Sequence, residues 1–503
     1  MKLREVLADV DARIDGADDV EIDGLAFDSR RAAPGILFFC VPGARADGHD
    51  FAQTAVEAGC AALVVERPLG LGVPEALVTD ARAAMAPAAA AFAGRPTDDL
   101  RVAGITGTNG KTTTAFLIRH TLESTGTRTG LLGTVKRVIG GVEAEVERTT
   151  PEAIELQATF RAMLHAGDRA CAMEVSSHAL RLGRTAGVHF AVAVFTNLTQ
   201  DHLDFHADME DYFAAKRMLF VPDPDGAGRP VDRPGVAIVN YDDVYGRRLA
   251  GEIAGEYGDR LITFSAAGER SAAIRAHDVE FDAAGARFRV SGALGELAVE
   301  MPLPGHFNVE NALAALATAV ALGAEPADAA SALADAARVP GRLEPVSEGQ
   351  GFAVLVDYAH TPDSLENVLR AARRLTAGRL ICVFGCGGDR DREKRPLMGA
   401  IAARLADVPV VTSDNPRSED PEAILDDILA GIPGGRAHEG LVVEVDRRAA
   451  IAAALATAGP DDAVVIAGKG HEQGQEFEQG RKLPFDDRDV ARDELRRLAA
   501  TRA

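Results

Sequence analysis

The amino-acid sequence predicts an α/β protein built from three domains. A chain of 503 residues exceeds the size at which a single hydrophobic core keeps growing. Clusters of turn-forming residues interrupt the pattern at 94–99 and at 339–342. Between and beyond these breaks, apolar strand-like runs alternate with helical stretches. We therefore expect domains at 1–98, 99–337 and 338–503.

The first domain is predicted to be a small α/β unit. Its apolar runs at 36–41 and 61–65 have the length and the β-branched or aromatic content of strands. Glycine-rich loops follow them, and the alanine-rich segment 81–92 is typical of a helix. The turn formers at 94–99 then end the domain.

The central domain is expected to contain a mostly parallel sheet covered by helices. A strand at 102–105 leads directly into a glycine-rich loop, and apolar runs at 171–175 and 190–195 alternate with helical stretches. The region 271–302 alternates more like antiparallel strands. The alanine-rich stretch at 312–337 is interpreted as packed helix rather than linker.

The third domain is predicted to be Rossmann-like because four further apolar runs alternate with helical stretches. These runs lie at 354–356, 380–384, 408–412 and 464–467. In such an open α/β sheet, ligands bind beyond the carboxyl ends of the strands. Polar residues that directly follow these runs are therefore candidates for a binding site.

Composition narrows the classes of function. The net charge of −22 argues against a module that binds nucleic acid or anionic lipid, so a phosphorylated ligand needs a local basic pocket. The N-terminus lacks an apolar signal region, and no segment approaches the roughly 20 apolar residues of a membrane helix. The cysteines are odd in number and scattered, which disfavours a disulfide framework or zinc site: Cys40, Cys60, Cys171, Cys382 and Cys386. We expect a soluble, cytoplasmic protein.

A glycine-rich loop at 104–114 (GITGTNGKTTT) follows the strand at 102–105 and precedes a helical stretch. In that position, backbone N–H groups and the helix N-terminus can hold phosphate oxygens. Lys111 would neutralise the β- and γ-phosphates, and Thr112 would hold Mg²⁺. Ile105 stands where the general phosphate-loop pattern has glycine, and a plain turn with a solvated lysine is the alternative. We expect ATP to contact Gly107, Thr108, Asn109, Gly110, Lys111, Thr112 and Thr113.

This compact GTNGKTT loop resembles the ATP loop of the Mur ligases and of the related folylpolyglutamate synthetases. Further motifs follow in the Mur ligase order from Asp28 to Glu472, over essentially the whole chain. The resemblance implies a UDP-sugar-binding N-terminal domain, a central P-loop ATPase domain and an amino-acid-binding C-terminal domain. It also implies a monomer that uses ATP and Mg²⁺.

The implied reaction adds meso-2,6-diaminopimelate to the D-glutamate γ-carboxylate of UDP-N-acetylmuramoyl-L-alanyl-D-glutamate. The bond forms through an acyl phosphate, in cytoplasmic peptidoglycan precursor synthesis. Homologues that add lysine or D-alanyl-D-alanine are alternatives, as is a folylpolyglutamate synthetase. A catalytically silent nucleotide-binding regulator is an alternative of another class.

Three residues are expected to complete the catalytic centre with Lys111. Glu174 ends an apolar strand and is the leading Mg²⁺ ligand. By resemblance, His202 binds a second Mg²⁺, and Lys216 is carbamylated so that it can help to hold that ion. Considered without the family, His202 would be an ordinary surface or buried histidine, and Lys216 a solvated charge on a helix.

The far end of ATP is assigned by resemblance. Asn308, in a GHFNVEN segment, is expected to reach the adenine, although a helix N-cap is the alternative. Arg342 and Asp357 belong to the third domain and are expected to touch the γ-phosphate and the ribose. ATP ligands on two domains predict that domain closure completes the site.

The UDP-linked substrate is also assigned by resemblance. In the first domain it is expected to contact Phe27, Ser29 and Arg45; in the central domain, Thr149, Thr150, Ser176 and Arg184. Two neighbours depart from the family pattern. Arg148 stands where asparagine is common, and Leu182 replaces a usual glutamine.

The tetrad Asp414, Asn415, Pro416 and Arg417 follows the apolar run at 408–412. It resembles the tetrad that marks diaminopimelate-adding members of the family, although a plain turn is the alternative. Diaminopimelate differs from lysine by a distal carboxylate, for which Arg417 offers a bidentate guanidinium. The resemblance completes this pocket with Arg390, Gly468 and Glu472, and Glu472 faces the distal ammonium.

Overall fold

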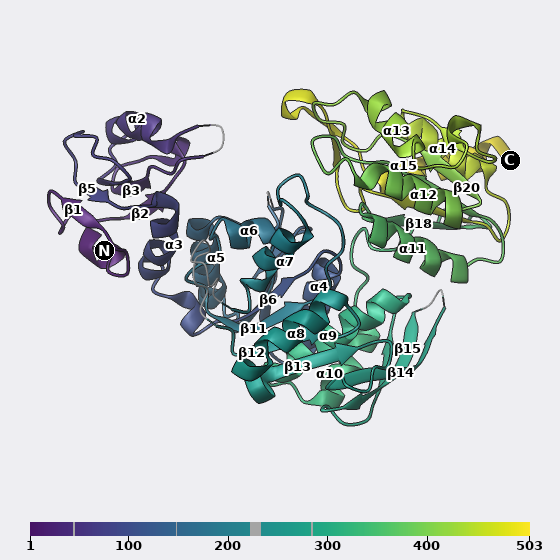
Figure 1. The fold of residues 1–503 in the computed structure, drawn as a ribbon, viewed down its shortest axis with the longest axis horizontal. Coiled ribbons are helices and arrows are strands. Elements are labelled where there is room, and N and C mark those ends of the chain that lie inside the picture. Colours follow the sequence, from purple (N-terminus) through teal and green to yellow (C-terminus); the bar gives the residue numbers. More distant parts are fainter. Residues whose placement is uncertain (44–45, 147, 222–232, 283–284, 503) are drawn as a thin grey trace.

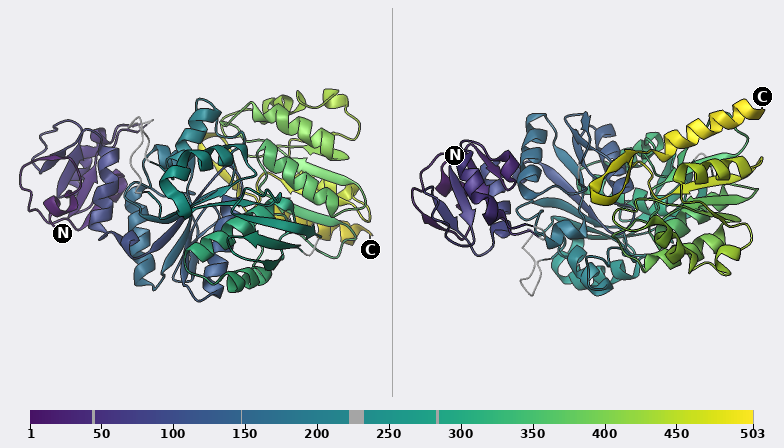
Figure 2. Two further views of the ribbon diagram at one scale, coloured as in Figure 1. Left: turned by 60° about the horizontal axis from the view of Figure 1, so that its bottom comes forward. Right: turned by 90° about the horizontal axis from the view of Figure 1, so that it is seen from above.

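A computed structural model describes residues 1–43, 46–146, 148–221, 233–282 and 285–502. The predicted three-domain α/β architecture is confirmed: a five-stranded, an eleven-stranded and a six-stranded sheet follow one another along the chain (Figure 1). The N-terminal and C-terminal domains lie at opposite ends of the central domain (Figure 2). The boundaries that we propose at 98/99 and 337/338 fall in the intervals between the sheets.

The N-terminal domain contains a five-stranded sheet in the order β1-β5-β4-β3-β2. Its elements are α1 (Leu3–Val6), β1 (Arg13–Asp15), β2 (Gly24–Ala26), β3 (Ile36–Phe39), α2 (Ala52–Glu57), β4 (Ala62–Val65), β5 (Glu75–Leu77) and α3 (Ala81–Phe92). The Asp80 side chain caps α3 by accepting from the Ala83 N–H at 2.9 Å. Buried alanines of α3 pack against Ala153 and Ala186 of the central domain, so this helix joins the two domains.

The central domain has an eleven-stranded sheet in the order β16-β15-β14-β13-β12-β11-β6-β10-β7-β8-β9. Its middle strands are parallel, with β6 (Arg101–Thr106) between β10 (Ala170–Glu174) and β11 (Phe190–Phe195). The other parallel strands are β7 (Thr129–Leu132), β12 (Val236–Asn240) and β13 (Leu261–Ser265). The antiparallel strands are β8 (Arg137–Ile139), β9 (Val142–Ala144), β14 (Ile274–Phe281), β15 (Ala286–Gly292) and β16 (Leu297–Met301). The antiparallel prediction for 271–302 is thus confirmed.

Helices cover both faces of this sheet (Figure 1). Apolar residues of α4 (Lys111–Ser124) and α9 (His306–Ala321) form one core with the sheet. Apolar residues of α5 (Ala153–His165), α7 (Met209–Arg217) and α8 (Val244–Tyr257) form a second core. The remaining helices are α6 (Ser177–Arg181) and α10 (Pro326–Ala332). Because both faces are buried, the central strands are continuous apolar runs, as the sequence showed.

The C-terminal domain has a six-stranded sheet in the order β17-β18-β22-β19-β20-β21, parallel except for β17. Its strands are β17 (Glu344–Pro345), β18 (Ala353–Asp357), β19 (Leu380–Phe384), β20 (Val408–Val411), β21 (Val442–Val443) and β22 (Ala463–Ala467). Its helices are α11 (Pro362–Arg374), α12 (Lys394–Leu405), α13 (Pro421–Leu429), α14 (Arg447–Thr457) and α15 (Asp487–Arg502). A separate hairpin joins β23 (Gly474–Glu476) and β24 (Lys482–Pro484).

Two further observations concern the whole chain. All five cysteines are buried free thiols. Within the part of the chain that the structure describes, no helix is long and apolar enough to cross a membrane.

Candidate active site

A cavity of about 690 Å³ lies beyond the carboxyl ends of β6, β10 and β11, where it is shared by the central and C-terminal domains. Open α/β sheets bind their ligands at this edge. Most of the residues predicted for ATP and for catalysis line it: Thr108, Asn109, Gly110, Lys111, Thr112, Thr113, Glu174, His202, Lys216, Arg342 and Asp357. Four residues predicted for the UDP-linked substrate line it as well: Thr149, Thr150, Ser176 and Arg184.

The phosphate loop requires glycine at two positions. Gly107 has φ +150°, and a Cβ there would lie 1.9 Å from the Thr196 hydroxyl oxygen. Gly110 has φ +87° and is the N-cap residue of α4. A loop without these side chains lets its backbone approach a polyphosphate closely, at the positive end of a helix. The geometry therefore fits the triphosphate of ATP.

Lys111 supplies the cation of this loop. Its ammonium donates to the carbonyl oxygens of Gly107 at 2.8 Å and Thr108 at 2.7 Å. Burial lowers the pKa of Lys111, and the nearby carboxylate of Glu174 opposes that shift. The Lys111 ammonium thus lies beside the phosphate loop, where it could contact the phosphate oxygens of ATP.

Thr112 and Glu174 form a pair of oxygen ligands suited to Mg²⁺. The Thr112 hydroxyl donates to Glu174 Oε2 at 3.0 Å, and Glu174 also accepts from the Thr134 N–H at 2.8 Å. Among the described residues, no group of three histidine, cysteine or acidic side chains is arranged to hold a metal. Mg²⁺ commonly takes one or two protein ligands and completes its shell with phosphates and water. The Thr112 hydroxyl and the Glu174 carboxylate match this coordination preference.

Lys216 is fully buried in α7. Its Nζ donates to the Gly107 carbonyl at 2.7 Å and lies 4.4 Å from the centre of the Tyr212 ring. Burial, reinforced by the positive charge of Lys111, holds the pKa of Lys216 well below its ordinary value. An amine donor cannot ligate Mg²⁺, but a neutral amine can react with CO₂ to give an anionic carbamate. The residue thus fits the predicted role only after that modification.

His202 follows β11 with φ +57°, an unusual backbone conformation for a residue with a side chain. Its ring meets that of His178 edge-on, with centroids 4.9 Å apart. Burial lowers the pKa of His202 to about 3, so the imidazole is neutral at pH 7 and keeps a lone pair for a metal.

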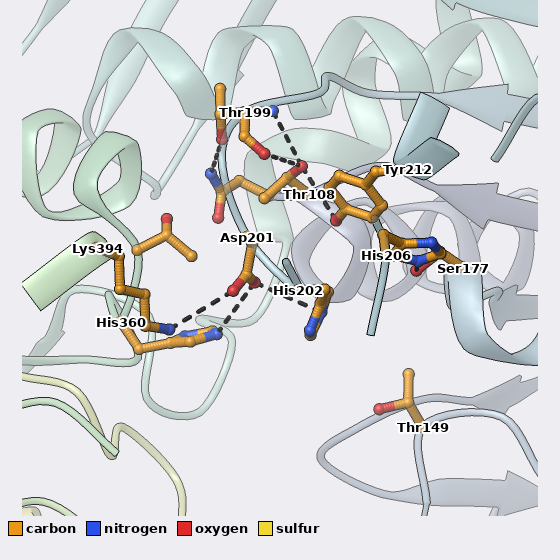
Figure 3. A network of polar contacts seen from close by, with 12 residues as sticks. Thr108, Thr149, Ser177, Thr199, Asp201, His202, His206, Tyr212, His360 and Lys394 are labelled. Atoms are coloured by element: carbon orange, nitrogen blue, oxygen red, sulfur yellow. Dashed lines mark hydrogen bonds and ion pairs between the residues drawn. The ribbon is translucent and has the colours of Figure 1, made fainter. Parts of the chain in front are cut away.

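Asp201 is a site residue that sequence reasoning missed. Its carboxylate lies 3.4 Å from His202 Nε2, 3.8 Å from His360 Nε2 and 3.5 Å from Lys394 Nζ, as Figure 3 shows. Burial alone raises the pKa of Asp201, but these three groups outweigh burial and lower it. His360 and Lys394 belong to the C-terminal domain, so this network joins two domains across the cavity. No local sequence signal marks Lys394.

The structure contradicts one of the two expectations for Asn308, and its predicted adenine contact stays a prediction. The N-cap residue of α9 is Gly305, so the N-cap alternative for Asn308 is wrong. The Asn308 amide donates to the Pro304 carbonyl at 2.8 Å and accepts from Asn311 at 3.1 Å, and it does not line the cavity. Asn311 and Glu310 line the cavity instead.

Glu310 is a second residue that sequence reasoning missed. Its carboxylate accepts from the Asn240 amide at 3.1 Å. Burial raises the pKa of Glu310 to about 8, and the nearby carboxylates of Asp242 and Asp363 add to the shift. The sequence marked Glu310 only through the GHFNVEN segment, in which Asn308 was the predicted ligand.

Arg342 crosses from the C-terminal domain to the phosphate loop. Its Nη2 donates to the Thr112 hydroxyl at 3.1 Å, and its guanidinium lies 4.6 Å from the centre of the Tyr358 ring. Asp357 accepts from the backbone N–H groups of Leu343 at 2.7 Å and Ala359 at 2.8 Å. Asp357 therefore fixes the turn that carries Arg342, while its predicted ribose contact stays a prediction.

The residues predicted for UDP lie apart from this cavity. Ser29 begins a short helical turn in the N-terminal domain, and the Asp28 side chain caps that turn by accepting from the Arg30 N–H at 3.0 Å. Phe27 packs against the core of the same domain. Arg45 lies outside the described residues.

The residues predicted for the peptide end converge near Glu174. The Thr150 hydroxyl donates to the Glu174 carbonyl at 2.9 Å, and Arg184 Nη1 donates to the Thr150 carbonyl at 3.3 Å. Ser176 caps α6 by accepting from the Ala179 N–H at 3.2 Å. This chain of contacts places the predicted peptide end beside the predicted metal ligands.

A second polar cluster forms where β20 and β22 end. Asn415 donates to Glu472 Oε2 at 2.9 Å, and both accept from Lys469 Nζ, at 2.9 and 3.0 Å. Lys469 has no exposed side-chain surface and was missed from the sequence. Gly468 has φ +119°, and a Cβ there would lie 2.7 Å from Asp414 Oδ2. The structure thus brings the predicted amino-acid-binding residues together.

Arg417 has φ +52° and is held on two sides. Its Nε donates to Glu476 Oε2 at 2.9 Å, and its Nη1 donates to the Gly388 carbonyl at 2.8 Å. The backbone of Pro416 packs against the same glycine, where a Cβ would lie 1.9 Å from the Pro416 oxygen. Arg390 follows in the same loop and is largely solvated, with Nη1 donating to the Asp389 carbonyl at 2.9 Å.

Comparisons with known proteins agree with this geometry. Three family models match: "Mur ligase family, catalytic domain" at 21–95, "Mur ligase middle domain" at 105–319 and "Mur ligase, glutamate ligase domain" at 341–470. The UDP-N-acetylmuramoyl-L-alanyl-D-glutamate–2,6-diaminopimelate ligase of Streptomyces coelicolor is 50% identical over 95% of this chain and 93% of its own length. The ligase of the same name from Geobacillus kaustophilus is 49% identical over 94% of each chain.

Solved structures show the same similarity. A UDP-N-acetylmuramoyl-L-alanyl-D-glutamate–2,6-diaminopimelate ligase matches with a TM-score of 0.70 and 33% identity over 99% of both chains. MurF from Acinetobacter baumannii shares the fold, with a TM-score of 0.66 and 19% identity over 99% of this chain and 98% of its own. The family models cover most of the sequence, and the close relatives span nearly all of it. This chain therefore belongs to the Mur ligase family.

Proposed function

We propose that this protein joins meso-diaminopimelate to the D-glutamate γ-carboxylate of UDP-N-acetylmuramoyl-L-alanyl-D-glutamate, with conversion of ATP to ADP and phosphate. The observation that carries this proposal is the shared cavity, in which the phosphate loop, Glu174 and Lys216 of the central domain face Arg342 of the C-terminal domain. Relatives about 50% identical over nearly the whole chain bear the name of this activity.

In the first step, an oxygen of the γ-carboxylate attacks the γ-phosphorus of ATP, the bond to ADP breaks, and an acyl phosphate forms. Carboxylate and triphosphate repel each other, so the step needs cations between them. Lys111 and Arg342 provide two such cations, one from the central domain and one from the C-terminal domain. Magnesium bound by Thr112 and Glu174 would supply further charge neutralisation.

A second magnesium ion requires a change in Lys216. As an amine, this residue donates to Gly107 and offers no ligand oxygen. Carbamylation adds CO₂ to the neutral amine and releases one proton, which leaves an anionic oxygen ligand beside His202. We propose that the depressed pKa of Lys216 serves this chemistry.

In the second step, the amine of diaminopimelate attacks the acyl carbon, phosphate leaves, and the nitrogen loses a proton. The polar cluster at the ends of β20 and β22 selects the amino acid that supplies this amine. Arg417 pairs with the distal carboxylate, and Glu472 receives the distal ammonium. Lysine lacks the carboxylate, so it leaves a partly buried guanidinium without its partner.

The ligands of ATP sit on two domains of one chain, which supports catalysis by a monomer that closes around its substrates. Closure keeps water away from a hydrolysable acyl phosphate. The N-terminal domain would hold the UDP moiety through Phe27, Ser29 and Arg45. Buried free thiols suit a reducing compartment, and we assign the reaction to the cytoplasm.

The test measures phosphate release with ATP, Mg²⁺ and UDP-N-acetylmuramoyl-L-alanyl-D-glutamate, with diaminopimelate or L-lysine as the acceptor. We expect turnover that depends on the UDP-linked precursor and prefers diaminopimelate by about 100-fold or more. Equal use of lysine would refute the role of Arg417 but leave a ligase. Nucleotide binding without turnover on either amino acid would point to a regulator.

A further inference from the structure

Three arginines gather around one buried carboxylate beside the cavity. We call Arg82, Arg148 and Arg184 the arginine cluster. Their guanidinium nitrogens lie 3.0, 3.6 and 2.9 Å from the carboxylate oxygens of Glu152, whose side chain is only 5% exposed. Arg82 belongs to α3 and the other members to the central domain, so the cluster lies where these two domains meet.

The arginine cluster carries more positive charge than its partner can balance. Within the described residues, Glu152 is the acidic group paired with all three members, which leaves an excess of two positive charges. Burial lowers the pKa of Arg184, Glu152 opposes that shift, and Arg148 and Arg82 add to it. Arg184 Nε is buried and lies near Glu152 without being aligned to donate. Such a site favours an anion.

Among the three members of the arginine cluster, Arg148 is the most accessible to an anion. It lines the cavity, its side chain is 50% exposed, and its separation from Glu152 is the longest of the three. Arg184 also lines the cavity, whereas Arg82 does not. Two guanidinium groups therefore face the same space beside Glu152.

The contacts of Arg184 place this space near the reacting end of the precursor. Arg184 donates to the Thr150 carbonyl, and the Thr150 hydroxyl donates to the carbonyl of Glu174, the candidate magnesium ligand. The precursor ends in a glutamate with two carboxylates. The γ-carboxylate must reach the phosphate loop, so the unreactive α-carboxylate stays close by and needs a counter-charge.

We propose, on the basis of the proposed function, that Arg148 binds the α-carboxylate of the terminal D-glutamate together with Arg184. The diphosphate of UDP is a second anion on the same substrate. The link through Thr150 to Glu174 favours the α-carboxylate, which belongs to the reacting residue.

The experiment compares two precursors and two variants. One precursor is UDP-N-acetylmuramoyl-L-alanyl-D-glutamate, and the other carries an α-carboxamide in place of the α-carboxylate. The variants are Arg148→Asn and Arg137→Asn, a control because Arg137 is exposed on β8 and does not line the cavity. Calorimetric binding of each precursor and kcat/KM for phosphate release are measured for all combinations.

A charge-assisted hydrogen bond corresponds to a loss of about 10- to 100-fold when it is removed. We expect Arg148→Asn to lose about this much in affinity and in kcat/KM for the acid precursor, with no change in the KM for ATP. With the amide precursor, the variant should lose less than about 3-fold, because the contact is already gone. Arg148→Lys, which keeps a charge, should fall between, and the control should match the wild type.

An equal loss on both precursors would place Arg148 at the diphosphate and overturn the proposal. No loss on either would overturn it as well. A wild-type protein that binds neither precursor would refute the proposed function and this inference together. Binding by the wild type without any dependence on residue 148 would refute only the inference.

Discussion

Arg417→Lys is the substitution that most directly tests how the amino-acid pocket selects its substrate. The guanidinium is fixed on two sides, because Nε donates to Glu476 and Nη1 donates to the Gly388 carbonyl. Within the described part of the chain, Nη2 of Arg417 forms no hydrogen bond and remains available for a ligand. A lysine ammonium cannot keep both anchors and still present two donors in a plane.

The magnitude follows from the bonds that the lysine cannot replace. Bidentate pairing with the distal carboxylate of diaminopimelate uses two charge-assisted hydrogen bonds, and the ammonium retains about one. The loss is therefore about 1.5–3 kcal/mol, or roughly 10- to 150-fold in kcat/KM for diaminopimelate. The KM for ATP should not change, because Arg417 does not line the nucleotide cavity. Use of L-lysine should change little, because lysine has no distal carboxylate that could pair with residue 417.

The assay is phosphate release under saturating ATP and UDP-linked precursor, with diaminopimelate and L-lysine varied in turn. Arg436→Lys is the matched control, because this exposed arginine of the same domain forms only surface ion pairs. An equal loss on both amino acids would show that Arg417 supports the fold of the pocket rather than recognising a carboxylate. An unchanged preference would refute the reasoning altogether.

Three further changes test other parts of the structure. Wild-type protein in ¹³C-labelled bicarbonate should give a carbamate NMR signal that Lys216→Met lacks, and Lys216→Met should lose at least about 100-fold in kcat; a wild type without the signal contradicts this role. Asp487→Asn leaves Arg447 buried without its partner at 2.6 Å and should lower the free energy of unfolding by about 3–5 kcal/mol in urea, whereas the exposed control Asp489→Asn should cost less than about 1. Glu310 titrates near 4.5 when unfolded and, with its pKa raised to about 8, binds an extra proton between those values when folded, so its contribution to stability falls as pH rises. Because the Glu310 side chain is 26% exposed, we expect its contribution to the free energy of unfolding to change by only about 1 kcal/mol. The Tm difference between Glu310→Gln and the wild type should therefore grow by roughly 2–4 °C from pH 5 to pH 8.5, and a difference that stays constant contradicts this reasoning.

Much of the fold was predictable because its signals are local. The buried parallel strands read as continuous apolar runs, and the run at 190–195 coincides with β11. The helix predicted at 81–92 coincides with α3, which Asp80 caps. The hairpin of β8 and β9 escaped prediction because its strands are short and partly exposed, so burial leaves little pattern in the sequence.

The phosphate loop was predictable for the same reason. Its glycines, lysine and threonine are adjacent in sequence, and the strand before them and the helix after them fix their geometry. Asn308 shows the limit of such reasoning. The segment was identified, but its amide bonds within the start of α9, and the neighbouring residues Glu310 and Asn311 face the cavity.

The sequence by itself determined the strands, the glycine-dependent loop and the tetrad at 414–417, because each depends on residues that are neighbours in the chain. Only the tertiary structure decided that Lys394 pairs with Asp201, that Lys469 donates to Asn415, and that three arginines surround Glu152. These contacts join residues from different elements, and the first joins different domains. No periodicity or spacing in the sequence identifies the partner of a single lysine or arginine. Its role can be assigned only when tertiary packing determines which residues surround it.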